Sequence, residues 1–231
     1  FTLASLVVGA RLLALAARTR ALAEAAFGTS LFLGGAGFVL LVLASRVIAA
    51  ESAPVPFAAG NLVLHVGSMA LAFGTWRVFR PAERWPAALV TGIGAVLAAS
   101  FAIRVEHLRM IPPPAAVFWM STLAEAAVYA WSTAESLRFW TMMRRREALG
   151  LANPAITRRF GLWGLCTACA IGMHAASMAG RLLAGDVMSP AAIVASSALG
   201  LVAAISLALA FLPRRAGART DGPEAAAQRA R

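Results

Sequence analysis

The stretch PAAIVASSALGLVAAISLALAFL, residues 190–212, runs for 23 residues without a charged side chain. A helix of this length crosses a bilayer, whose hydrocarbon core needs about 20 apolar residues. Similar apolar runs occur at 1–17, 28–50, 57–78, 86–104, 115–137 and 160–182. We predict seven transmembrane helices, because a lone strand in lipid leaves its backbone groups without hydrogen bonds.

The first run also has the length of a signal peptide. However, Arg11 interrupts its apolar part and no small-residue cleavage site follows, so we expect a helix there. Composition agrees with a membrane protein, since 60% of the residues are hydrophobic and 13% are charged. In soluble domains, about 45–50% of the residues are hydrophobic and about 25% are charged. The sequence predicts an all-α integral membrane protein, with a seven-helix bundle over 1–212 and a polar, disordered cytoplasmic tail over 213–231.

Orientation is predicted from arginine, because all 21 basic residues are Arg. One set of helix ends, together with the tail, carries Arg18, Arg20, Arg77, Arg80, Arg84, Arg138, Arg144, Arg145, Arg146, Arg158, Arg159, Arg214, Arg215, Arg219, Arg229 and Arg231. The opposite ends carry only Arg46, Arg104, Arg109 and Arg181. Basic residues accumulate in cytoplasmic loops, which predicts an outside N-terminus and a cytoplasmic C-terminus. Abundant Ala, Arg, Gly and Pro without Lys suggest a GC-rich bacterial genome, and therefore the inner (cytoplasmic) membrane.

The formal net charge of +11 does not predict nucleic-acid binding, because the arginines flank helices and follow the topology. Contact with anionic lipid headgroups of the bilayer explains them more simply. We expect a loop over 141–159 that holds a short interfacial helix broken at Asn153-Pro154. That loop is also a candidate docking surface for a cytoplasmic partner, and other membrane subunits are further candidate partners.

The absence of lysine excludes one class of seven-helix protein. A retinal Schiff base needs a lysine amine, and the seventh run has none. The sequence therefore predicts no conventional retinal site. Beyond the number of helices, no family motif is present.

Polar residues lie in stripes along three of the predicted helices. An ionisable side chain at membrane depth normally faces the protein interior or a cavity. At 1.5 Å per residue, His65 and His174 lie about 12 Å below the outer surface, Glu125 about 15 Å, and the serines at 196 and 197 about 10 Å. These groups can meet in one layer of the outer half. The predicted pocket lining is Asn61, Ser68, Ser121, Thr167, Ser196 and Ser197.

His65 and His174 are the main candidate ligands. They can simply form interhelical hydrogen bonds. Alternatively, two imidazoles on different helices can bind haem b iron axially. Together with Glu125 they can form a His2Glu metal site, for which zinc is the candidate. The cofactor is left open.

Three other polar residues have plainer interpretations. Glu125 without a partner would stay protonated and donate to a neighbouring helix, or it could carry protons. Glu135 precedes Arg138 by three residues, which predicts a surface pair. Cys166 and Cys169 lie inside an apolar run, where we expect small-residue packing rather than redox chemistry.

The leading functional hypothesis is a binding protein, either a sensor or a subunit of a larger membrane complex, with an intramembrane polar pocket at His65 and His174. The alternatives are a metal-dependent lipid hydrolase, a transporter or proton path centred on Glu125, and a purely structural subunit. No nucleophile elbow, phosphate loop or HExxH motif is present, and no loop is long enough for a soluble catalytic domain. The sequence therefore favours a non-enzymatic role and predicts no catalytic residue.

Overall fold

In a computed structural model, the chain forms seven α-helices and no strand over the residues that the structure describes, which are 1–48, 52–108, 114–187 and 189–212. The predicted tail over 213–231 lies outside these residues. The helices are α1 (Thr2–Thr19), α2 (Leu22–Arg46), α3 (Pro54–Phe79), α4 (Trp85–Glu106), α5 (Ala115–Ala148), α6 (Pro154–Ala184) and α7 (Pro190–Phe211).

Six of these helices, all except α5, are long and apolar enough to cross a membrane. The chain is therefore an all-α, multi-pass membrane protein, as its sequence predicts. α5 is the most polar of the seven along its length, since it carries Glu125, Glu135 and the arginine triplet at 144–146. Its two glutamates are buried where α5 packs among α3, α4 and α6, whereas the arginine triplet is exposed.

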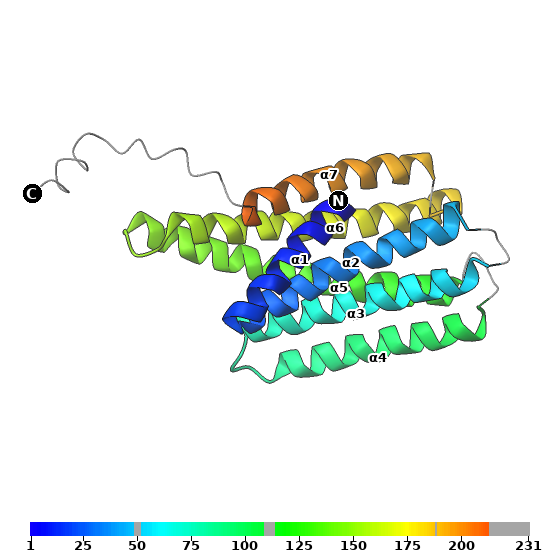
Figure 1. The fold of residues 1–231 in the computed structure, drawn as a ribbon, viewed down its shortest axis with the longest axis horizontal. Helices are drawn as coiled ribbons and strands as arrows, with labels where there is room; N and C mark the ends of the chain where they lie inside the picture. Colours follow the sequence, from blue (N-terminus) through cyan, green and yellow to red (C-terminus); the bar gives the residue numbers. More distant parts are fainter. Residues whose placement is uncertain (49–51, 109–113, 188, 213–231) are drawn as a thin grey trace, which may run out of the picture.

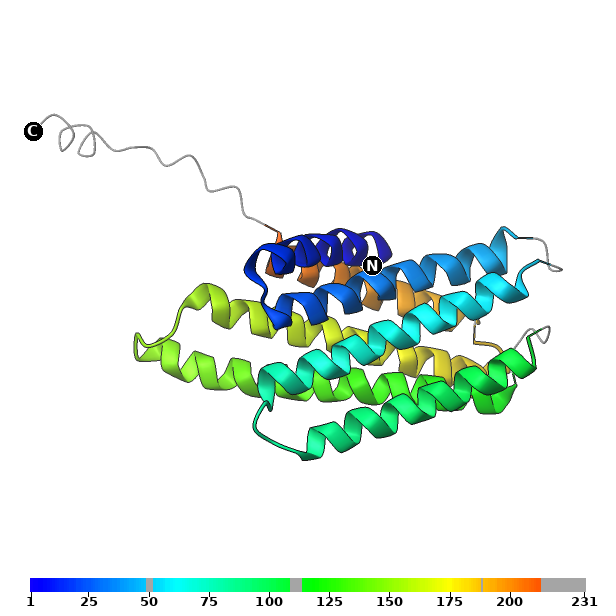
Figure 2. The same cartoon turned by 60° about the horizontal axis from the view of Figure 1, so that its bottom comes forward.

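The helices form a ring with one helix outside it. α1, α2, α3, α5, α6 and α7 pack in that order, and α7 returns to α1. α4 packs only against α3 and α5, on the outer side of the ring, and it lies at the edge of the bundle in Figure 1. Figure 2 shows the same arrangement with α4 brought forward. α3 and α6 both pack on α5, and they also meet directly where the ring centroids of Phe79 and Phe160 lie 5.9 Å apart.

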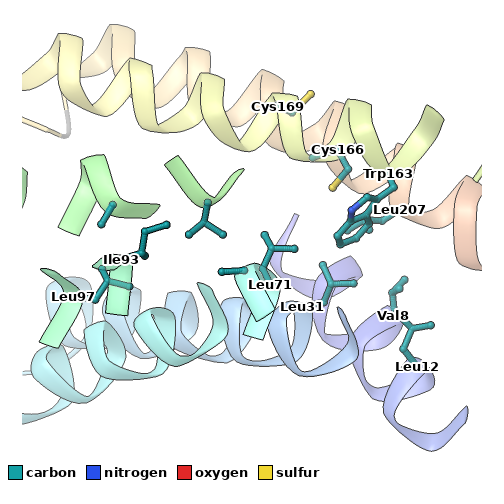
Figure 3. Close-up of a cluster of buried hydrophobic side chains, with 14 residues drawn as sticks. Val8, Leu12, Leu31, Leu71, Ile93, Leu97, Trp163, Cys166, Cys169 and Leu207 are labelled. Carbon is teal, nitrogen blue, oxygen red and sulfur yellow. The ribbon is translucent and has the colours of Figure 1, made fainter. Parts of the chain in front are cut away.

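The interior of the ring is filled by apolar side chains. The cluster runs from Ile93 and Leu97 on α4 through Leu71 to Trp163 and Leu207 (Figure 3). The aromatic rings of Phe27 on α2 and Trp163 on α6 meet at a centroid distance of 5.1 Å. Cys166 and Cys169 are buried, free thiols within this cluster, which confirms the packing role predicted for them.

A row of glycines brings α2 and α3 close together. Gly60, Gly67 and Gly74 recur every seven residues on α3, on the side that faces α2. A Cβ atom at Gly67 would lie 3.2 Å from the Gly34 backbone nitrogen, and one at Gly74 would lie 2.9 Å from the Ala26 Cβ. Small residues allow this approach, which favours helix association in lipid.

The predicted loop over 141–159 is wrong. α5 continues as a helix to Ala148 and α6 already begins at Pro154. Asn153 caps α6, because its side-chain oxygen accepts a hydrogen bond from the Ala155 backbone N–H at 2.9 Å. The Asn-Pro pair thus starts a helix instead of breaking one. The hydropathy pattern misses this extension because it detects only the apolar part of each helix.

The two ends of the bundle differ in charge. The α1–α2, α3–α4 and α5–α6 connections and the end of α7 lie at one end. We call this the arginine-rich end, because among the described residues it carries Arg18, Arg20, Arg77, Arg80, Arg84, Arg138, Arg144, Arg145, Arg146, Arg158 and Arg159. The N-terminus lies about halfway along the bundle, where Phe1 packs beside Gly200 in the middle of α7 (Figures 1 and 2).

Candidate functional site: a buried polar layer

The centre of the site is a contact between α3 and α5. His65 Nδ1 lies 2.9 Å from Glu125 Oε1. Both residues are buried, with exposed fractions of 7% and 9%. His65 follows the start of α3 by 11 residues and Glu125 follows the start of α5 by 10, which puts both about 15 to 17 Å from those helix ends. An imidazole and a carboxyl therefore share a hydrogen bond inside the bundle, well away from these helix ends.

The second half of the layer joins α5 to α6. Tyr129 lies one turn after Glu125, and its ring packs on the His174 imidazole with centroids 5.5 Å apart and planes inclined at 36°. His174 precedes the end of α6 by 10 residues, again about 15 Å. His65, Glu125, Tyr129 and His174 thus form one layer across α3, α5 and α6, which we call the buried polar layer.

The two histidines contact different partners. His65 bonds to Glu125 and His174 packs on Tyr129, and both of these partners are on α5. Among the described residues, no three His, Cys, Asp or Glu side chains gather closely enough to hold a metal ion, and this includes His65, His174 and Glu125. The arrangement brings two ionisable side chains together in a hydrogen bond, which is chemistry suited to holding and releasing a proton.

The predicted lining residues are dispersed. Ser68 and Thr167 are buried, and Thr167 Oγ1 accepts a hydrogen bond from Thr133 at 2.8 Å. Asn61 and Ser121 are half-buried and donate to carbonyls one turn earlier, Phe57 at 2.9 Å and Val117 at 2.7 Å. On α7, Ser196 is half-buried and Ser197 is exposed. These serine and asparagine contacts are local to their own helices.

An apolar layer lies next to the buried polar layer, toward the arginine-rich end. It contains Leu71 on α3 and Val128 on α5, both with an exposed fraction of 0%. Beyond it lie the hydroxyls of Thr75 and Ser132, which are buried without a hydrogen-bond partner among the described residues. The same two helices therefore alternate polar, apolar and polar levels along their shared interface.

A second ion pair joins α3 and α5 at the arginine-rich end. Arg80 Nε donates to Glu135 Oε1 at 2.8 Å, and Arg80 Nη1 donates to Glu83 Oε1 at 2.6 Å. Trp85 Nε1 also donates to the Glu83 carboxylate. The hydrogen bond from Arg80, followed by that from Trp85, lowers the pKa of Glu83 below its usual 4.5. The pKa of Arg80 is raised, chiefly by its hydrogen bond to Glu83, against the opposing effect of burial.

Sequence reasoning misses several of these residues. The predicted surface pair of Glu135 with Arg138 is wrong, because Glu135 is buried against Arg80 while Arg138 is exposed. Tyr129, the only tyrosine, has a usable signal, since it follows Glu125 by four residues on the same helix face. Arg104 on α4 is also buried, with its guanidinium 4.8 Å from the Phe57 ring centroid. Because Arg104 lies near a helix end, the sequence gives no indication that its side chain is buried.

The fold and the buried polar layer define the class: a multi-pass helical membrane protein with ionisable side chains paired inside the bundle. No protein-family model matches the chain, and no curated protein or solved structure matches it significantly. Function therefore has to be argued from the site itself.

Proposed function

We propose that the chain is a proton-responsive membrane protein, a sensor in which the His65–Glu125 pair is the element that changes charge. One observation carries the proposal: the 2.9 Å contact between two ionisable side chains within the bundle. We further propose that the arginine-rich end faces the cytoplasm, that the N-terminus lies outside, and that the host is the inner membrane of a bacterium. The arginine asymmetry supports this orientation.

The physical reason is the cost of net charge in lipid. A His–Glu pair with one shared proton is neutral overall, whether the proton sits on nitrogen or on oxygen. Adding a proton leaves a net positive charge, and removing the shared proton leaves a net negative charge. Either change places an uncompensated charge at membrane depth, which costs several kcal/mol. A single protonation step therefore changes how strongly α3 and α5 associate.

Two features favour a sensor over a proton path. The fully buried Leu71 and Val128 lie on α3 and α5 between the pair and the hydroxyls of Thr75 and Ser132. α5 also runs without interruption from Glu125 to Ala148. A continuous helix can transmit a change in its packing along its length, whereas proton transfer needs a connected line of donors and acceptors.

The other hypotheses have less support. Axial haem ligation needs both imidazoles to face one space, and here one bonds to Glu125 while the other packs on Tyr129. A metal-dependent hydrolase needs a ligand trio, which does not gather among the described residues. A purely structural subunit remains the outcome if the pair does not titrate.

The test is infrared spectroscopy of the full chain in lipid nanodiscs, titrated from roughly pH 4 to pH 9, the range over which glutamate and histidine titrate. We expect a carboxylic-acid band that changes with pH and disappears in Glu125→Gln. His65→Gln should shift the pH at which it changes. Glu83→Gln is the matched control, because Glu83 is an exposed carboxylate outside the bundle, and the band should persist there.

A carboxylic-acid band that does not change with pH in the wild-type protein would overturn the proposal. Proton flux into liposomes provides the second readout, with an entrapped pH dye. A sensor produces no flux above that of empty liposomes, whereas flux abolished by Glu125→Gln would assign proton transfer in place of sensing.

A further inference from the structure

α5 and α6 project beyond the other helices at the arginine-rich end (Figures 1 and 2). The Arg80–Glu135 contact puts Glu135 level with the end of α3. Ala148, the last residue of α5, lies 13 residues further along, about 20 Å at 1.5 Å per residue. The headgroup region on each side of a bilayer is about 5 to 8 Å thick. The end of this hairpin, residues 144–159, therefore stands in water, and we call it the hairpin tip.

The hairpin tip exposes apolar side chains where lipid does not cover them. Leu149 and Leu151 have exposed fractions of 73% and 74%, and Ile156 has 44%. Large apolar side chains grouped on a surface in water mark an interaction site. The helices of the membrane-spanning part also expose many such residues, but there the acyl chains cover them.

The same tip carries a concentrated positive charge. Arg144, Arg145, Arg146 and Arg159 are exposed and Arg158 is half-buried. Glu147 is the only acidic residue among residues 144–159. Five arginines against one glutamate attract an acidic partner and repel a basic one.

A groove lies between the two helices of the tip. Its volume is about 430 Å³. Its lining includes Trp140, Arg144 and Glu147 from α5 and Pro154, Arg158 and Leu162 from α6. The Arg144 guanidinium lies 5.2 Å from the Trp140 ring centroid, so an aromatic floor and two arginines face the same space. Such a groove can hold one apolar anchor side chain with a carboxylate beside it.

We infer that the hairpin tip is a docking surface for an acidic, amphipathic segment of a protein in the aqueous phase. The exposed leucines fit the apolar face of that segment, and the arginines fit its carboxylates. A second copy of this chain is the wrong occupant, because it would bring the same arginines. Lipid headgroups are disfavoured by reach, since the tip extends beyond them. The inference does not depend on the proposed proton response.

The test uses a synthetic peptide with glutamate and leucine at helical spacing, labelled with a fluorophore, and the full chain in zwitterionic phosphatidylcholine nanodiscs. We expect saturable binding that weakens about tenfold or more in the double variant Arg144→Gln, Arg158→Gln. The double variant Leu149→Ser, Leu151→Ser should weaken it to a similar degree. All four residues lie on the hairpin tip, outside the bundle, so the fold is preserved.

Two matched controls distinguish binding at the hairpin tip from nonspecific attraction to positive charge or apolar surface. Arg18→Gln with Arg20→Gln removes two arginines at the same end, and Leu182→Ser with Leu183→Ser removes two leucines with exposed fractions of 70% and 88% at the opposite end. Both should leave peptide affinity unchanged. Equal loss in the controls, or no peptide binding at all, would overturn the inference. Native mass spectra provide a further check. If the chain retains phosphatidylglycerol through Arg144 and Arg158 but binds no peptide, the tip is a lipid site and the inference is overturned.

Discussion

Two acid–base pairs connect α3 with buried glutamates of α5, and they differ in the base and in its exposure. The pair inside the membrane is His65 with Glu125, both buried, and its base can lose its charge. The pair at the arginine-rich end is Arg80 with Glu135, where the arginine is always charged, is partly exposed and has Glu83 as a second partner. In this protein the permanently charged base lies where water and a second carboxylate stabilise it, whereas the titratable base lies where they do not.

The largest effect is expected for Glu125→Ala. It leaves the His65 imidazole buried without its partner, and removal of one member of a buried pair costs about 3 kcal/mol. The measurement is the free energy of unfolding in mixed micelles. The double variant His65→Leu, Glu125→Leu should recover most of the loss, because apolar side chains of similar size replace a buried pair at little cost. Equal losses in the single and double variants would mean that packing, rather than pairing, holds these residues.

A smaller effect is expected for Arg80→Ala. Glu135 then remains buried without its donor, but Arg80 is partly exposed and water can enter, so we expect a smaller loss of stability than for Glu125→Ala. Arg138→Ala is the control for the pairing partner, since the exposed Arg138 should change stability by less than about 0.5 kcal/mol. If Arg138→Ala costs as much as Arg80→Ala, the pairing drawn here for Glu135 is incorrect.

The smallest effect concerns Glu83 and pH. Because its pKa is lowered in the folded protein, its contribution is fully present above its usual value of 4.5 and is lost as the pH falls through the lowered value. The protection of the amides around the α3–α4 turn, measured as the exchange rate relative to the intrinsic rate at the same pH, should therefore fall as the pH drops below 4.5. Glu83→Gln should remove that acid dependence and lower the protection at neutral pH to the value reached in acid. Protection that is independent of pH in the wild-type protein would contradict the lowered pKa.

Much of the fold follows from hydropathy alone. Seven apolar runs predict seven helices, and α4 and α7 agree with their predicted bounds to within two residues. The extensions of α5 and α6 are missed because charged, helix-forming sequence outside the membrane has no hydropathy signal. The Asn153-Pro154 pair is the local signal that should have marked the start of α6.

The sequence predicts how deep the site residues lie along their helices, but it does not predict which way their side chains point. Counting residues from helix ends predicts similar depths for His65, Glu125 and His174, and His65 and Glu125 are in contact in the structure. Which way each side chain turns depends on the order of helices in the ring, which no residue count supplies. α5 lies between α3 and α6, so Glu125 meets His65, while His174 meets Tyr129.

A proton response of the His65–Glu125 pair is tested most sharply by a double-mutant cycle between His65→Leu and Glu125→Leu, with stability measured at neutral and acidic pH. We predict a coupling free energy above about 1 kcal/mol at neutral pH that falls when the second proton binds. A coupling that stays near zero, or that is the same at both pH values, would contradict the claim that this pair responds to protons.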